Sequence, residues 1–217
     1  MIIHTVLNTL KIKCSYNDFE KLLQEIKGNN RNEFIDFNAI IPMPQELEYG
    51  DTLESIRKPF LHDSDAVYWY LKMIDNKEIT SKIDIADLDR IKSHIEFDKK
   101  RFFRGETFEE FLEFSHLTKE KLIEFSEKYI YLFCKYGYTN PYSWRIDNWG
   151  TKRNAQNSKI SKEDKTIWFE TAWDGVPQIM EKLVQKYPNF EFEYSYEYDD
   201  KLIEYYGKNG ILTMRNL

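Results

Sequence analysis

An alternating stretch at residues 190–198 is the feature that most constrains this fold. Aromatic side chains take every second position there, and acidic or small polar ones take the others. A period of two predicts a β-strand with one face covered by other elements and one face in water. We expect helices to cover the rings, which argues against nucleobases stacking on them. The aromatic positions are Phe190, Phe192, Tyr194, Tyr196 and Tyr198, and the polar ones are Glu191, Glu193, Ser195, Glu197 and Asp199.

Each end of the chain repeats one pattern, which is a strand, an amphipathic helix and a second strand. Pro42 and Pro44 end the second strand of the first set, because proline has no backbone N–H to donate. Joined in order, the two sets predict an α+β fold, the ferredoxin-like split βαβ arrangement with an antiparallel sheet. The predicted elements are strand 3–14, helix 16–27 and strand 33–41, then strand 165–172, helix 176–186, strands 190–198 and 201–206, and a last short strand.

The interior of the chain, residues 51–137, lacks alternation and shows apolar stripes at helical spacing. We interpret it as a helical insertion between the second and third strands of the sheet. The sequence contains no Ser/Gly-rich linker on either side of it. We therefore predict one composite domain over 1–217, with a ferredoxin-like core formed by 1–50 and 138–217.

Charge and composition narrow the class of partner. The 217 residues include 37 acidic and 31 basic ones, with a formal net charge of −6 and a pI near 5.4. Nucleic-acid-binding domains normally have a basic face and a high pI, so we expect a protein or small-molecule partner rather than a nucleic acid. No apolar run reaches the length of about 18 residues that suggests a membrane span. The cysteines, Cys14 and Cys134, and the lack of a basic cleavable leader predict a cytoplasmic protein with free thiols.

The segment from Tyr138 to Trp173 contains four of the five tryptophans, with polar residues between them. Two interpretations stay open. In one, a glycine lets backbone approach a ligand while Lys152 and Arg145 neutralise an anion. In the other, the segment is a tight turn that a tryptophan anchors. We expect Trp149 and Trp173 to be buried near each other. The candidate ligand-binding residues are Trp144, Arg145, Asn148, Trp149, Gly150, Thr151, Lys152 and Trp173.

Other candidate chemistry is weaker. Glu170 and Asp174 could form an acid–base pair, but Asp174 is more simply explained as a helix cap. None of the four histidines has the spacing of metal ligands. We therefore predict no catalytic residue, metal or cofactor, and a non-enzymatic binding or interaction module. The alternative is a small enzyme with an anion-binding site at Trp144–Lys152. The histidines are His4, His62, His94 and His116.

Several of these segments together resemble the YubB / Api92-like family. The similarity lies in FNAIIPMPQEL, GYTNPYSWRIDNWGTKRNA, FETAW and YPNFEFEYSYEYDD, and the run Asn148-Trp149-Gly150-Thr151-Lys152 is its most specific part. The resemblance implies a ferredoxin-like domain and an origin in phages, plasmids or bacterial mobile elements, but no particular reaction. The chain departs from the family at Arg153, where an aromatic residue is frequent. It keeps only Asn8-Thr9-Leu10 of the family's N-terminal segment.

Overall fold

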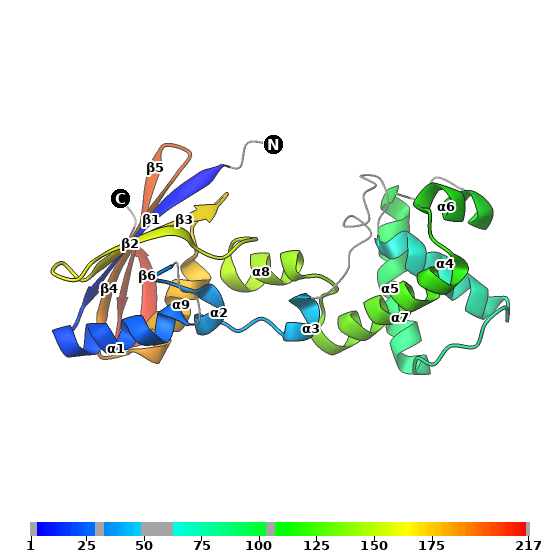
Figure 1. Cartoon of the computed structure of the whole chain (residues 1–217), viewed down its shortest axis with the longest axis horizontal. Helices are drawn as coiled ribbons and strands as arrows, with labels where there is room; N and C mark the ends of the chain where they lie inside the picture. The colour runs from blue at the N-terminus through cyan, green and yellow to red at the C-terminus, as the bar shows by residue number, and fades with distance from the viewer. Residues whose placement is uncertain (1–3, 29–32, 49–62, 103–106, 216–217) are drawn as a thin grey trace. The chain divides into compact units, whose positions relative to one another are not determined.

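A six-stranded antiparallel sheet with the order β2-β3-β1-β4-β5-β6 dominates the computed structural model, which describes residues 4–28, 33–48, 63–102 and 107–215 (Figure 1). The alternating stretch forms β4, between β1 and β5, so its predicted central position is confirmed. The strands are β1 (Thr5–Lys13), β2 (Gln156–Ser161), β3 (Thr166–Ala172), β4 (Glu191–Tyr198), β5 (Lys201–Lys208) and β6 (Ile211–Arg215).

The first four strands and two helices have the ferredoxin-like topology. Along the chain, β1 is followed by α1 (Tyr16–Lys27), and β2 and β3 are followed by α9 (Pro177–Lys186) and β4. In space the strands lie in the order β2-β3-β1-β4, all antiparallel, which is the split βαβ arrangement. The predicted ferredoxin-like α+β fold is thus confirmed, and β5 and β6 extend its sheet.

The strand predicted at residues 33–41 is wrong, since this segment contains the short helix α2 (Phe37–Ile40). Asp36 caps that helix and accepts a hydrogen bond of 2.9 Å from the Asn38 backbone N–H. The true second strand is β2, whose sequence QNSKIS has no apolar alternation because it is a largely exposed edge strand. The helical insertion therefore lies between α1 and β2, and not between the second and third strands.

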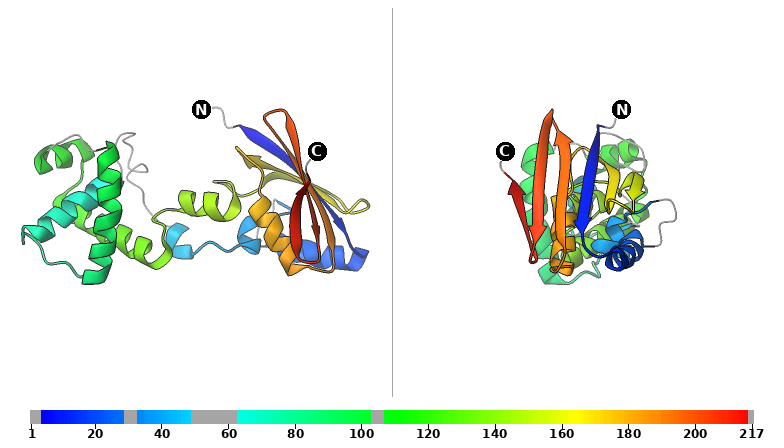
Figure 2. Two further views of the ribbon diagram at one scale, coloured as in Figure 1. Left: turned by 180° about the vertical axis from the view of Figure 1, so that it is seen from behind. Right: turned by 90° about the vertical axis from the view of Figure 1, so that its left-hand side faces the viewer.

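Helices α1 and α9 pack on the same face of the sheet, as expected from their apolar stripes (Figure 2). Side chains of alternate residues of each strand point to that face, which we call the covered face. No described helix of this part of the chain packs on the opposite, uncovered face (Figure 2). Buried helix residues on the covered face are Phe19, Leu22, Leu23 and Ile26 of α1, and Ile179, Met180, Leu183 and Val184 of α9.

The chain divides into two compact units, 1–43 with 142–217 and 44–141. The second unit is helical in its described residues and has its own apolar core, to which Tyr70, Ile91, Leu122 and Ile130 contribute. The single composite domain over 1–217 stays a prediction, which limited proteolysis near residues 50 and 138 would test. The helices of this unit are α3 (Gln45–Glu48), α4 (Asp63–Asp75), α5 (Ile85–Phe102), α6 (Phe108–Ser115) and α7 (Lys119–Tyr136).

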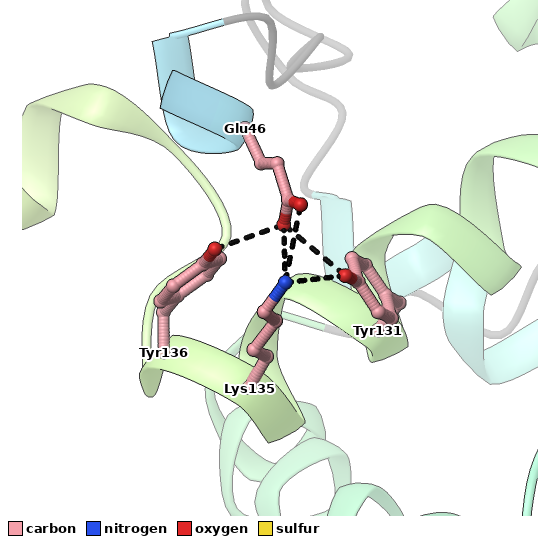
Figure 3. A network of polar contacts seen from close by, with 4 residues as sticks. All are labelled: Glu46, Tyr131, Lys135 and Tyr136. Atoms are coloured by element: carbon pink, nitrogen blue, oxygen red, sulfur yellow. Dashed lines mark hydrogen bonds and ion pairs between the residues drawn. The ribbon is translucent and has the colours of Figure 1, made fainter. Parts of the chain in front are cut away.

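A polar network joins α3, near the start of this unit in the sequence, to α7, near its end (Figure 3). The Lys135 ammonium on α7 donates to both carboxylate oxygens of Glu46 on α3, at 3.1 and 2.9 Å, and to the Tyr131 hydroxyl at 2.7 Å. The Tyr131 and Tyr136 hydroxyls donate to the same carboxylate at 3.2 and 2.9 Å. The hydrogen bond from Lys135 is the main cause of a lowered Glu46 pKa. Because every group has a partner within the network, we assign it a structural role.

Candidate functional site

Two of the four tryptophans, Trp144 and Trp149, lie on α8 (Pro141–Trp149), where they anchor the helix to the covered face. Trp149 is 2% exposed, and its ring makes edge contacts with Trp144 at 5.8 Å and Phe37 at 5.9 Å between centroids. Its indole N–H donates to the Ile41 carbonyl oxygen at 2.9 Å. Trp149 and Trp144 therefore belong to the core.

The polar residues that follow are engaged within the fold. The Asn148 amide donates to the Trp144 carbonyl oxygen at 2.9 Å, and the Thr151 hydroxyl donates to that of Ala172 at 3.0 Å, so their expected bonds to backbone are confirmed. Gly150 has a φ of 83°, a left-handed conformation that glycine adopts without strain. A Cβ atom there would lie only 2.5 Å from the Gln178 Oε1 atom. The turn thus requires glycine for structural reasons.

Two cations of the segment lie over aromatic rings. The Lys152 ammonium is 4.8 Å from the centroid of Trp173, and the Arg145 guanidinium is 5.4 Å from that of Trp149. Trp173 is 45% exposed, so the expectation that it is buried near Trp149 is wrong. It follows the end of β3 in a left-handed conformation, with a φ of 80°, and its backbone N–H donates to the His4 carbonyl oxygen. The Arg145 Nε atom is buried and has no hydrogen-bond partner among the described residues.

The structure does not bring Glu170 and Asp174 together. Glu170 lies on the uncovered face of β3, whereas Asp174 approaches Tyr196, whose ring is on the covered face. Asp174 accepts a 2.7 Å hydrogen bond from the Gly175 N–H but does not cap α9, since that helix begins after Val176 and has no side-chain cap.

Across residues 4–28, 33–48, 63–102 and 107–215, no cluster of three His, Cys, Asp or Glu side chains could hold a metal. In the same ranges, no helix is both long and apolar enough to cross a bilayer.

A buried polar network on the covered face was not predicted. Asn8 of β1 is 0% exposed, and its amide donates to the Thr171 hydroxyl at 2.8 Å. The Tyr194 hydroxyl donates to Asn8 Oδ1 and accepts from the Val176 N–H, each at 2.6 Å. Burial raises the Tyr194 pKa well above its ordinary value. The network ties β1, β3 and β4 to the start of α9, and the sequence signal for it was the lone polar residue Asn8 among the inward positions of β1.

The uncovered face carries a hollow that the sequence did not single out. Its volume is about 540 Å³, and side chains from three adjacent strands line it. Leu7 of β1 is 57% exposed within it. Trp168 of β3 lies directly opposite Lys159 of β2 in the strand register, and Glu170 lies opposite Leu7. The lining residues are Leu7, Asn157, Ser158, Lys159, Trp168 and Glu170.

A β-bulge in β2 shapes this hollow. The register between β2 and β3 shifts between Gln156 and Lys159, and Asn157 takes a left-handed φ of 52°. The Glu33 carboxylate accepts hydrogen bonds from the Asn157 and Ser158 backbone N–H groups, at 3.1 and 2.7 Å. The Asn157 amide donates to Glu170 Oε2 at 2.7 Å. Glu33 thereby holds the bulge in place, and Asn157 orients Glu170.

These features define an α+β protein with a ferredoxin-like sheet, one face of which is uncovered and hollowed. Residues 148–211 match the family model described as the ferredoxin-like domain in Api92-like protein. The match runs from the end of α8 to the start of β6 and confirms the resemblance to the Api92-like family. Among solved structures, protein Api92 from Yersinia pseudotuberculosis is similar at 9% identity and a TM-score of 0.44, with 100% of this chain and 99% of that chain covered. No curated protein matches the chain.

Proposed function

We propose that this chain is a non-enzymatic binding module and that the hollow on the uncovered face is its binding surface. The main support for this proposal is the set of side chains that line the hollow. An indole, an exposed leucine, an ammonium and a carboxylate come from three strands of one rigid sheet. Apolar surface with a few placed polar groups is typical of small-molecule sites.

The engagement of the candidate polar residues supports a module without catalysis. The side chains of Asn148 and Thr151 donate hydrogen bonds to backbone carbonyl oxygens. Glu170 and Asp174 lie on opposite faces of the sheet. The acid–base pair considered from the sequence would need both carboxyl groups within reach of one substrate, and this arrangement does not offer that. Binding at the hollow needs only a fixed surface, which the sheet provides.

The charges of the uncovered face favour a protein or small-molecule partner over a nucleic acid. Two lysines there are paired with glutamates across the strands, Lys13 with Glu193 at 2.7 Å and Lys208 with Glu191 at 2.6 Å. A phosphate backbone would have to displace these carboxylates. We further propose that the module works in the cytoplasm, where Cys14 and Cys134 would stay free thiols, and, following the family resemblance, that a phage, plasmid or other bacterial mobile element encodes it.

A fragment screen tests the proposed function. Fragments would be added to the ¹⁵N-labelled full chain, and shifted amide signals would be mapped on the fold. We expect the hits to perturb the amides of Leu7, Lys159 and Glu170 and to be recovered chemically unchanged. Hits that avoid these amides, or that are converted to product, would contradict the proposal.

The second candidate is an enzyme or anion-binding protein with its site at Trp144–Lys152. One observation favours it, which is the pair of cations near Trp149 and Trp173 with the buried, unpartnered Nε atom of Arg145. Lys152→Ala should change the free energy of unfolding by about 0.5 kcal/mol or less, because it removes a surface side chain. If this folded variant loses phosphate or sulfate binding that the parent chain shows, the second candidate replaces the first.

A further inference from the structure

The side chains that line the hollow on the uncovered face suit one class of small molecule. We infer that it binds a neutral pyranose sugar ring, either free or at the end of a glycan. This inference rests on the proposed function, since it names the ligand class for the same hollow. The order of the lining side chains, their charges and the hydrogen bonds that hold them support it.

The strand register sets the order of the side chains. Trp168 lies between Thr9 of β1 and Lys159 of β2, so its indole occupies the middle of three strands. Glu170 is the next residue along β3 on the same face, and Leu7 lies opposite it. The hollow therefore has an aromatic centre, an apolar side at Leu7, and a charged group of each sign near the ring.

A pyranose ring matches this order. One face of such a ring presents C–H groups, which are attracted to the negative face of an aromatic ring. Its hydroxyls both donate and accept, so they can donate to the Glu170 carboxylate and accept from the Lys159 ammonium. Hydrogen bonds to charged groups are the stronger kind, and they fix the orientation of the ring. The volume of about 540 Å³ lies within the usual range of small-ligand sites.

Other ligand classes fit less well. An anion would meet the Glu170 carboxylate, and a cation would meet the Lys159 ammonium. A wholly apolar ligand would take both charges out of water without replacing their hydrogen bonds, which is costly. A neutral molecule with an apolar face and a rim of hydroxyls avoids all three penalties.

The site is also held in position before any ligand arrives. Glu33 binds the two backbone N–H groups of the bulge, and Asn157 binds one oxygen of Glu170. The Asn157 bond leaves the second carboxylate oxygen, Oε1, for a ligand hydroxyl. A carboxylate fixed in this way loses little side-chain entropy on binding, which favours affinity.

Titration of the ¹⁵N-labelled full chain with sugars tests the inference. The probes are the methyl pyranosides of glucose, galactose and mannose, and maltohexaose as a glycan. Inorganic phosphate, free lysine and toluene represent the competing anionic, cationic and apolar classes. We expect saturable shifts of the Leu7 and Lys159 amides with at least one sugar. The dissociation constant should rise about tenfold or more in Glu170→Gln and in Trp168→Ala, which each remove one main contact, and less in Trp168→Phe, which keeps a ring.

Two control variants lie on the same face outside the hollow. Leu202→Ala removes a leucine that is 48% exposed on β5, and Glu197→Gln neutralises an exposed carboxylate on β4. Both should bind sugar as the parent chain does. A stronger response to maltohexaose than to the monosaccharides identifies a glycan end, and the reverse identifies a free sugar.

The outcomes separate the two proposals. If phosphate, lysine or toluene shifts the Leu7 and Lys159 amides and no sugar does, the sugar inference is overturned while the binding function stands. If no probe and no fragment shifts these amides, both fail. If sugar binding is unchanged in Glu170→Gln and Trp168→Ala, the sugar binds elsewhere and the assignment to the hollow is wrong.

Discussion

The two faces of the sheet differ in what their side chains do. On the covered face, Leu10 and Phe192 pack under the helices, and even the polar Asn8 has all its bonds inside the protein. On the uncovered face, adjacent positions of the same strands carry paired charges and an open hollow. Within one strand, the residues on the covered face thus contribute to stability, and the residues between them, on the uncovered face, are available for binding. Substitutions on the two faces should therefore differ in the kind of effect they have.

The largest contrast is expected between two tryptophans. Trp149→Ala removes a core ring and should reduce the free energy of unfolding by about 3–5 kcal/mol, because a cavity is left behind. Trp173→Ala removes a ring that is 45% exposed and should cost about 1 kcal/mol or less. Urea unfolding followed by circular dichroism measures both. Equal losses would show that the exposed ring also belongs to the core.

Adjacent residues of β1 give the next contrast. Asn8→Ala deletes the centre of the buried network and leaves the Tyr194 hydroxyl without its acceptor, at a cost of about 2–3 kcal/mol. Thr9→Ala, one residue further and on the uncovered face, should cost about 0.5 kcal/mol. The same unfolding measurement applies. Equal losses of unfolding free energy in the two variants would contradict the distinction between the faces.

A comparison of alanine substitutions at two glycines separates the free-energy cost of backbone strain from that of steric contact. Gly150 and Gly137 both have positive φ values, of 83° and 75°. Alanine at either position should cost about 1–2 kcal/mol for the left-handed conformation. At Gly150 the new Cβ also meets Gln178, whereas at Gly137 no atom of the described residues lies within 4 Å. Gly150→Ala should therefore be the more destabilising of the two, and equal losses in thermal unfolding would mean that Gln178 moves freely aside.

The smallest effect concerns the ion pairs of the uncovered face. The hydrogen bond from Lys13 is the main cause of a lowered Glu193 pKa. A carboxylate with a lowered folded pKa contributes stability that is present above the unfolded pKa, near 4.5, and lost as pH falls through the folded value. In Lys13→Met, the Glu193 pKa should rise toward its ordinary value, and acid should then destabilise the protein less steeply. Carboxyl NMR titration measures the pKa, and Lys201→Met is the control that leaves the pair intact.

The sequence determined most of the fold because its strongest signals are local. The alternation of β4 and the stripes of α1 and α9 depend on residues a few positions apart, and all three elements form where predicted. The second strand was misplaced for the same reason. Residues 33–41 have local apolar content, while β2 has little, since an exposed edge strand buries few side chains.

Tertiary structure alone decided the candidate sites. The sequence grouped Trp149, Trp168 and Trp173 because they are close along the chain, yet the first is core, the second lines the hollow and the third is on the surface. The hollow depends on the register that sets Leu7 opposite Glu170 and Trp168 opposite Lys159, and on a bulge that Glu33 holds. Local sequence patterns cannot specify such pairings, because each one joins residues that become neighbours only when distant strands pair.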